Sequence, residues 1–273
     1  MHPYVAWMSK RPLLNALLVV FYYIIVVAPH KKFGTFLNTV VFDLDNKRDQ
    51  YNLYVIIGAT ALLALYTVFF FKGSRKRADK SKLWFYMLIN ILFAIIIVNF
   101  LFVVNIEVIH FAQYAAFAIL IYPMIRNYNS TLMWTTIAGS IDEAYQNFYL
   151  APNDTGYYDW NDVITNLVGG VFGLLLLKSF GVRQHVNSPW SKSSGIRAFT
   201  VMCVLVLCLW LSGYLSIYPS DSSTIQLVSK ELTGFWNQVS EYSPPEIVFH
   251  IVRPLEGIIT TVLLFLFYSR IGE

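Results

Sequence analysis

Runs of apolar residues long enough to cross a membrane recur along the whole length of this 273-residue chain. Each run is bounded by charged residues or by proline and glycine, and about 18 apolar residues in a row can cross a bilayer as a helix. Only 13% of the residues are charged, against about 25% in soluble domains, so a water-soluble fold is a poor expectation. The sequence therefore predicts an all-α, polytopic transmembrane helical bundle.

We expect about eight spans, and they cover residues 12–28, 51–71, 83–104, 108–124, 132–150, 163–180, 198–218 and 246–268. The first span follows two basic residues, as in a signal peptide, but the sequence around Ala28 offers no convincing cleavage site, so we expect an uncleaved helix. Cys203 and Cys208 lie on one predicted span at a spacing that matches no metal site, which favours a packing role.

Basic residues set the expected orientation. The segment 72–82 carries six cations against one anion, and the positive-inside rule places such a loop in the cytoplasm. Alternation of the spans from this loop brings the other basic clusters and both chain ends to the same side. The acidic loops then fall on the outer side, and this agreement supports the number of about eight spans, because dropping one span would invert half of the loops.

Two outer segments show helical periodicity of their own and are too short and too polar to span, so each predicts an amphipathic helix on the outer interface. The apolar positions of the first are Phe33, Phe36, Leu37, Val40, Val41 and Leu44. Those of the second are Ile225, Val228, Leu232, Phe235, Trp236 and Val239, after a capping box formed by Ser223 and Gln226.

Polar residues inside the predicted spans gather near one depth, in the outer half of the membrane. Ionisable groups in a bilayer cost a few kcal/mol each, so they usually face the protein interior and have a role. The stripes on spans four, five, six and eight comprise Glu107, His110, Gln113 and Tyr114; Gly139, Glu143 and Gln146; Asp162, Asn166, Gly169, Gly170 and Gly173; and Glu246, His250, Arg253 and Gly257. A shared cavity open to the outer leaflet explains all four, with the four glycines Gly139, Gly169, Gly170 and Gly173 allowing close helix packing.

Several of these residues also fit structural roles. Asp162 is suited to cap span six, His110 to satisfy its hydrogen bonds at the interface, and Arg253 to form an ion pair with Glu256 next to a kink at Pro254. Glu143 lies several residues inside its span above Gln146, and this depth favours a functional role.

Three motifs on successive predicted spans resemble the VanZ-like family of small bacterial membrane proteins. They are Glu107-Val-Ile-His110-Phe-Ala-Gln-Tyr114, Asp142-Glu143-Ala-Tyr-Gln146 and Asp162-Val-Ile-Thr-Asn166-Leu-Val-Gly169-Gly170-Val-Phe-Gly173. The resemblance covers about residues 84–180. Family members often carry an arginine in the loop between the second and third motifs, whereas this chain does not, and Arg253 is the obvious outer-half cation to replace it.

The resemblance divides the chain into an N-terminal two-span region (1–83), a VanZ-like four-helix core (84–180) and a C-terminal two-span region (181–273), each terminal region with one outer interfacial helix. It implies the cytoplasmic membrane of a bacterium, with both termini in the cytoplasm, and a setting close to lipid-linked precursors of the cell envelope, because the family is named for a protein linked to teicoplanin resistance.

Three functions stay open at this point. The chain is a lipid-binding or accessory subunit; an enzyme acting on a lipid-linked envelope precursor, with Glu143 as general acid or base and His110 as its proton partner; or a small-molecule transporter, which the lack of internal repeats disfavours. The residues expected to bind the substrate or lipid are Tyr114, Gln146, Asp162, Asn166, His250 and Arg253. We expect membrane lipids as partners, with a larger membrane protein complex as a further candidate, and we expect no nucleic acid and no cofactor. We also expect no metal, since His110, His250, Glu143 and Asp162 show no ligand spacing within one segment.

Overall fold

The computed structural model of the chain describes residues 2–27, 36, 44–103, 105–150, 156–184, 193–220, 223, 225–229, 234–239 and 247–272. Its helices are α1 (Pro3–Ser9), α2 (Pro12–Tyr22), η1 (Tyr23–Val27), α4 (Leu44–Ser74), α5 (Lys80–Phe100), η3 (Asn105–Val108), α6 (Ile109–Ile125), α7 (Tyr128–Tyr145), η4 (Gln146–Leu150), α8 (Trp160–Ser179), α9 (Ser194–Leu211), α10 (Pro254–Tyr268) and η6 (Ser269–Gly272). Its short strands are β1 (Leu215–Ser216), β2 (Ile225–Gln226), β3 (Asn237–Val239) and β4 (Ile247–Phe249).

Among the described residues, six helices are long and apolar enough to cross a membrane, and they cover Gln50–Ser74, Lys80–Phe100, Ile106–Ile125, Trp160–Ser179, Ser194–Leu211 and Pro254–Gly272. The pair Pro3–Ser9 and Pro12–Val27 would add a seventh, but it is bent by 101°. The fifth predicted span is helical as α7, although its threonines, serines and acidic residues make it less apolar. The all-α bundle fits the prediction, while the number of eight spans stays a prediction.

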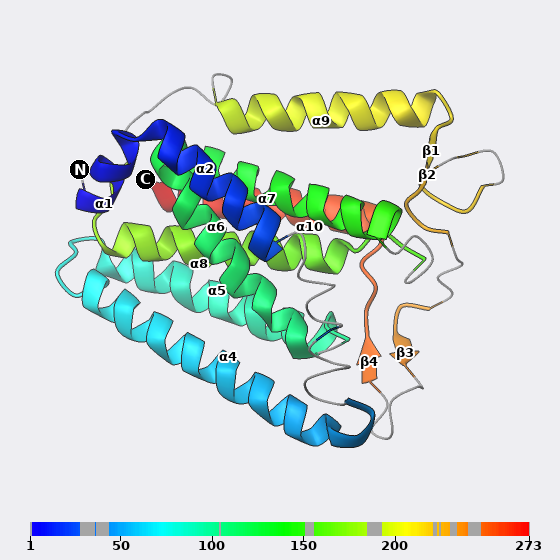
Figure 1. Ribbon diagram of the computed structural model, residues 1–273, viewed down its shortest axis with the longest axis horizontal. Helices are drawn as coiled ribbons and strands as arrows, with labels where there is room; N and C mark the ends of the chain where they lie inside the picture. Colours follow the sequence, from blue (N-terminus) through cyan, green and yellow to red (C-terminus); the bar gives the residue numbers. More distant parts are fainter. Residues whose placement is uncertain are drawn as a thin grey trace.

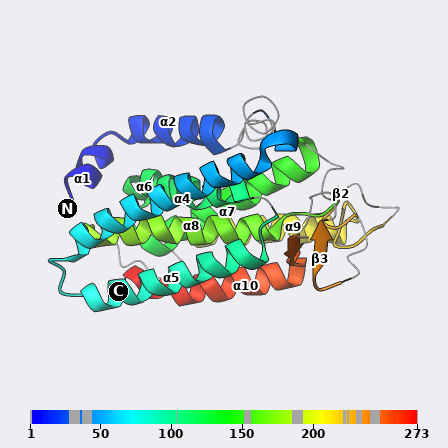
Figure 2. The same ribbon diagram turned by 90° about the horizontal axis from the view of Figure 1, so that it is seen from below.

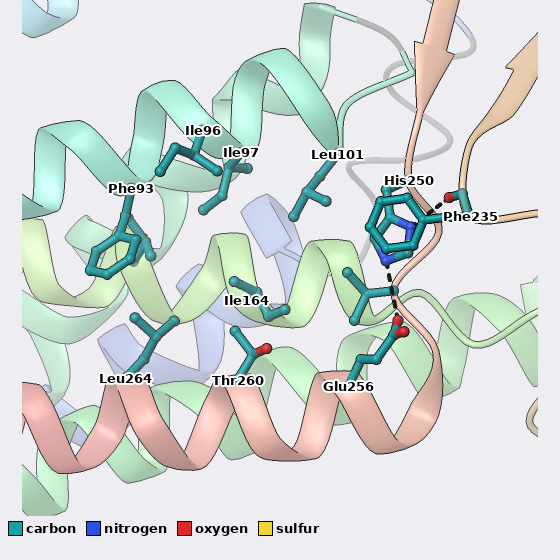
Figure 3. A pocket seen from close by; sticks show the side chains of 12 residues that line it. Phe93, Ile96, Ile97, Leu101, Ile164, Phe235, His250, Glu256, Thr260 and Leu264 are labelled. Carbon is teal, nitrogen blue, oxygen red and sulfur yellow. Dashed lines mark hydrogen bonds and ion pairs between the residues drawn. The ribbon is translucent and has the colours of Figure 1, made fainter.

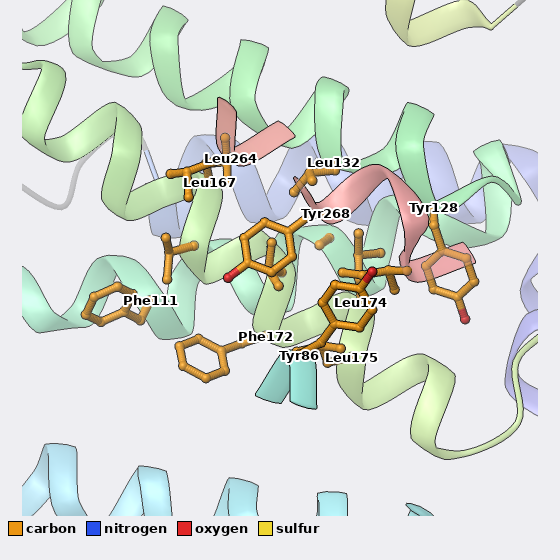
Figure 4. Close-up of a cluster of buried hydrophobic side chains, with 14 of the residues drawn as sticks. Tyr86, Phe111, Tyr128, Leu132, Leu167, Phe172, Leu174, Leu175, Leu264 and Tyr268 are labelled. Atoms are coloured by element: carbon orange, nitrogen blue, oxygen red, sulfur yellow. The ribbon is translucent and has the colours of Figure 1, made fainter. Parts of the chain in front are cut away.

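Helix α8 runs through the middle of the bundle (Figure 1 and Figure 2). In its most apolar 18-residue stretch 83% of the residues are buried, against 6% in each of α4 and α9. It packs against α4, α5, α6, α7 and α10. The apolar core gathers around it (Figure 4), and Leu167, Leu174 and Leu175 of α8 belong to the same buried cluster as Phe111 and Tyr268. This central position explains why α8 carries polar residues on a face that never meets lipid.

Glycines allow α8 to approach α6 closely. A Cβ atom on Gly169 would lie 2.9 Å from the carbonyl oxygen of Phe111, and one on Gly173 would collide with the backbone of Ala115. Gly170 faces Thr135 of α7, where a Cβ atom would lie 2.8 Å from the Thr135 methyl carbon. The glycine stripe of span six therefore lies at helix contacts, as its spacing predicts.

The two ends of the bundle differ in charge. The basic α4–α5 loop with Arg75, Lys76 and Arg77 lies at the end where Figure 1 marks both chain termini. The four strands lie toward the opposite end, where α7 ends and α8 begins (Figure 1), and these two helix ends carry the acidic residues Glu143 and Asp162. We refer to these as the basic end and the acidic end.

The second predicted interfacial helix is wrong for the residues that the structure describes. Ile225–Gln226 is a strand paired with Leu215–Ser216, and Asn237–Val239 is a strand paired with Ile247–Phe249. Local periodicity does not detect partners that lie elsewhere in the chain, and β-branched Ile225 and Val239 suit strands. The first predicted interfacial helix lies outside the described residues except for Phe36 and for Leu44, where α4 begins.

The eighth predicted span also begins later than expected. Pro254 occupies the first turn of α10, and Arg253 before it is extended, with φ −73° and ψ 158°. A residue that precedes proline avoids the helical region, and proline suits the first helical position because its missing N–H has no helical partner there. His250 and Arg253 therefore lie on an extended segment rather than on a helical stripe, and Pro254 starts the helix instead of kinking it.

Candidate functional site

His110 of α6 lies between two polar side chains of α8. Its Nδ1 is 2.8 Å from Oδ1 of Asn166, and its Nε2 is 3.8 Å from Oδ2 of Asp162. Because the amide oxygen of Asn166 is an acceptor, this hydrogen bond places a proton on Nδ1. In the neutral imidazole, Nε2 then presents its lone pair toward Asp162.

Acidic residues of α7 complete this group. Gln146 donates from Nε2 to Oε1 of Glu143 at 3.1 Å and to Oδ2 of Asp142 at 3.3 Å. The hydroxyl of Tyr114 donates to the same Asp142 oxygen at 3.4 Å. One carboxylate oxygen of Glu143 lies within 4.8 Å of the nearest ligand atoms of His110 and Asp162. We call the residues His110, Tyr114, Asp142, Glu143, Gln146, Asp162 and Asn166 the α6–α8 cluster.

Helix packing sets the geometry of the α6–α8 cluster. A Cβ atom on Gly139 would lie 2.9 Å from Nδ2 of Asn166, so this glycine makes room for the amide that holds His110. Gly169 brings α8 against the backbone of His110 itself. Asp162 lies in the first turn of α8, after Asp159, whose side chain caps that helix. The structural role considered for Asp162 therefore belongs to Asp159.

The α6–α8 cluster is almost entirely enclosed. His110 and Glu143 are each 3% exposed and Asn166 is fully buried, whereas the side chain of Asp162 is 15% exposed. Asp162 is therefore the most open of these four groups, and it lies at the acidic end. A histidine with a fixed tautomer between carboxylates can transfer protons, and the same set can bind a cation or the donor groups of a polar ligand.

A second polar group lies on the other side of α8. His250 contacts Oε2 of Glu256 through Nε2 at 3.1 Å and the carbonyl oxygen of Phe235 through Nδ1 at 2.7 Å. Oε2 of Glu256 also accepts from the backbone N–H of Arg253 at 2.9 Å, and the Arg253 guanidinium donates to the Gly234 carbonyl oxygen at 3.4 Å. We call the residues Phe235, His250, Arg253 and Glu256 the α10 cluster.

The α10 cluster closes one end of an apolar cavity of about 430 Å³ between α5, α8 and α10 (Figure 3). Ile164 and Val168 of α8 line it, and they lie about 200° around the helix from Asp162 and Asn166. The other lining residues are Phe93, Ile96, Ile97, Leu101, Phe235, His250, Val252, Glu256, Thr260 and Leu264.

Asn161 ties the α10 cluster to the start of α8. Its Nδ2 donates to the carbonyl oxygens of Leu101 and His250 at 3.0 and 2.8 Å, and its Oδ1 accepts from the N–H of Val252 at 2.9 Å. This buried side chain thus holds the extended segment that leads into α10. No pattern in the sequence marks this role of Asn161, because a polar residue in the first turn of a helix usually serves only as a cap.

The structure divides the residues predicted for one site into two groups. Tyr114, Gln146, Asp162 and Asn166 lie with His110 and Glu143, whereas His250 and Arg253 lie in the α10 cluster. The 430 Å³ cavity is lined by His250 but by neither Glu143 nor His110, so a single cavity that joins all of the predicted residues stays a prediction. The contacts described for Arg253 join it to Glu256 and Gly234, so it stands beside His250 rather than Glu143.

No protein-family model, curated protein or solved structure matches this chain. The resemblance to the VanZ-like family therefore rests on the three motifs. The structure brings residues of all three motifs into one cluster, and the packing of α6, α7 and α8 is the physical reason.

Proposed function

We propose that this chain is a VanZ-like membrane protein that binds a lipid or a lipid-linked molecule at the acidic end of its bundle, as a binding or accessory protein of the cell envelope. The observation that carries this proposal is the apolar cavity between α5, α8 and α10, which ends at the polar pair His250 and Glu256. An apolar cavity with a few polar groups at one end suits an amphiphile.

The dimensions of the cavity fit one acyl segment. From Glu256 at the polar end to Leu264 there are eight residues of α10, a rise of about 12 Å. The neighbouring side chains Ile258 and Ile259 are about half exposed on the surface of the bundle, where lipid would surround them. We expect the acyl chain of a lipid in the surrounding bilayer to enter the cavity from the side, with the polar group of the lipid near His250.

The orientation is part of the proposal. The positive-inside rule assigns the basic end to the cytoplasm of a bacterial cell, which places both termini inside and the cavity in the outer half of the membrane. In a background with both native cysteines replaced by serine, we expect Ser229→Cys to react with an impermeant thiol reagent added to intact cells, and Arg75→Cys to react only after permeabilisation. The reverse labelling pattern would show that the protein has the opposite orientation in the membrane.

Two tryptophan substitutions on adjacent residues of α10 test lipid binding. Thr260 lines the cavity, whereas Ile259 is 50% exposed, so Thr260→Trp fills the cavity and Ile259→Trp adds the same bulk outside it. After purification in mild detergent, native mass spectrometry should find copurified lipid on the wild type and on Ile259→Trp, and none on folded Thr260→Trp. Equal lipid on both variants would refute the proposal.

A second candidate function is catalysis on such a lipid-linked substrate, and the geometry of the α6–α8 cluster favours it. His110 is fixed by Asn166 and faces Asp162, with Glu143 nearby, an arrangement suited to proton transfer. Glu143→Gln keeps the shape of the side chain and removes its titrating group. For an enzyme, we expect normal abundance and loss of complementation of a deletion strain, scored by lipoglycopeptide susceptibility. Full complementation by Glu143→Gln would exclude catalysis and leave lipid binding as the proposed function.

A further inference from the structure

We propose that His110, Glu143 and Asp162 bind one divalent transition-metal ion between α6, α7 and α8. Each of the three residues offers one ligand atom, and these atoms lie within 4.8 Å of one another. Nε2 of His110 and Oδ2 of Asp162 are 3.8 Å apart. Ligand atoms of a tetrahedral ion are about 3.4 Å apart, because each lies about 2.1 Å from the metal. Side-chain rotations of His110, Glu143 and Asp162 would bring their ligand atoms from these separations to the shorter distance that the ion requires.

The imidazole of His110 is oriented as in metal-binding histidines. Such histidines donate a hydrogen bond from one ring nitrogen to a neighbouring acceptor, which fixes the tautomer and directs the other nitrogen to the metal. Here Nδ1 donates to Asn166 Oδ1 at 2.8 Å, and Nε2 is directed toward the carboxylate of Asp162. Asn166 is therefore a positioning residue for the ion.

The carboxylate of Glu143 is held in a similar way. Gln146 donates to its Oε1 at 3.1 Å, and ligating carboxylates are commonly fixed by such hydrogen bonds. The side-chain amide of Asn166 also has N–H groups that are available to a ligand, because its fully buried Nδ2 makes no hydrogen bond within the described part of the chain. That N–H suits an oxygen atom of water or of a ligand bound beside the ion.

A bound cation also suits the buried setting of these carboxyl groups. Glu143 is 3% exposed, Asp142 is 1% exposed, and the side chain of Asp162 is 15% exposed, so carboxyl groups concentrate in a largely dry space. Ionised carboxylates are costly to bury unless positive charge compensates them. A divalent ion would compensate two of them, and the partial exposure of Asp162 provides a route for its entry.

The ligand types limit the identity of the ion. One imidazole and two carboxylates suit Zn²⁺ or Mn²⁺ better than Mg²⁺ or Ca²⁺, which prefer oxygen ligands only.

The test is metal binding by the full chain in mild detergent. After treatment with EDTA and removal of the chelator, the protein is titrated with Zn²⁺ and separately with Mn²⁺, and bound metal is measured by inductively coupled plasma mass spectrometry. We expect one ion per chain for the wild type, and a rise in the unfolding temperature on metal addition.

Matched substitutions locate the site. Glu143→Gln and Asp162→Asn should each weaken binding more than about 100-fold, and Asn166→Ala by about 10- to 100-fold through the lost orientation of His110. Asp79→Asn, at the basic end, is the control and should bind like the wild type. Absence of a bound ion on the folded wild type, or equal binding by Asp162→Asn and Asp79→Asn, would overturn the inference.

Lipid retention by the metal-stripped protein separates the two proposals. If the protein retains lipid but binds no metal, the proposed metal site is refuted and the proposed lipid binding is kept. If the protein binds one ion at these residues but retains no lipid, the proposed metal site is supported and the proposed lipid binding is refuted.

Discussion

The two polar clusters lie on opposite faces of α8 and are held in different ways. In the α6–α8 cluster, side chains from three packed helices contact one another directly, as His110 does with Asn166 and Gln146 with Glu143. In the α10 cluster, His250 contacts the carbonyl oxygen of Phe235, and its extended segment is tied to α8 through backbone groups. The first cluster therefore depends on helix packing, and the second depends on the extended chain that precedes α10.

This difference implies that each cluster can be damaged alone. The first should respond to added volume at the glycine contacts of α8, and the second to loss of the hydrogen bonds of Asn161. Ile164 and Val168 line the cavity on the face of α8 that carries the α10 cluster.

The largest effect is expected from Gly173→Ala. Its Cβ atom would collide with the backbone of Ala115, so α6 must move away from α8, and such overpacking costs about 1–3 kcal/mol or more. Gly58→Ala in α4 is the matched control, because no heavy atom lies within 4 Å of its Cβ position, and alanine should gain up to about 1 kcal/mol there. Thermal unfolding in detergent should show opposite shifts. An equal shift for both would mean that α6 and α8 do not meet at Gly173.

An intermediate effect is expected from Asn161→Ala. It removes three hydrogen bonds to the backbone of Leu101, His250 and Val252, at a cost of about 1–3 kcal/mol. Hydrogen exchange should accelerate at the amide of Val252 while the α6 amides keep their protection. Asn166→Ala should leave the exchange of Val252 unchanged. Loss of protection in both segments with either variant would show that the clusters are not independent.

The same contrast explains what the sequence could predict. The packing of helices α6, α7 and α8 follows from their stripes, since residues three or four apart share a helix face, and His110, Glu143 and Asn166 lie together in the structure. The stripe drawn through His250 and Arg253 failed because Pro254 ends the extended segment and begins the helix. Pro254 is a sufficient sequence signal for the start of a helix, and the predicted kink at this residue is wrong.

Other features could not be found by local reasoning. The strands at Ile225–Gln226 and Asn237–Val239 depend on partners elsewhere in the chain, and so does the bridge of Tyr157 with Val228. The role of Asn161 depends on three backbone groups contributed by two distant segments. The convergence of His110, Glu143 and Asp162 on one point involves one residue from each of three helices, a set without any ligand spacing inside a segment.

The smallest effect is expected at the basic end. Partial burial raises the pKa of Asp79. The hydrogen bond and charge of Arg77, whose Nε lies 3.0 Å from Oδ1 of Asp79, lower the pKa by more, so it falls below its ordinary value of 3.8. A lowered pKa stabilises the fold at pH values above the ordinary one, and this contribution is lost as the pH falls through the lowered value. Asp79→Asn should therefore reduce stability at pH 7 by only about 0.2–1 kcal/mol, as for other surface ion pairs. The difference from wild type in unfolding temperature should shrink as the pH falls below 3.8 and disappear once the pH lies below the lowered pKa of Asp79; a difference that grows on acidification would contradict this sign.

The most direct test of lipid binding beside the α10 cluster is an experimental structure of the wild-type protein crystallised in a lipidic mesophase. We predict elongated density in the cavity between α5, α8 and α10, running from His250 and Glu256 toward Leu264, with the two polar clusters on opposite faces of α8. A cavity filled by the protein's own side chains, with lipid density confined to the outer faces of the bundle, would contradict this prediction.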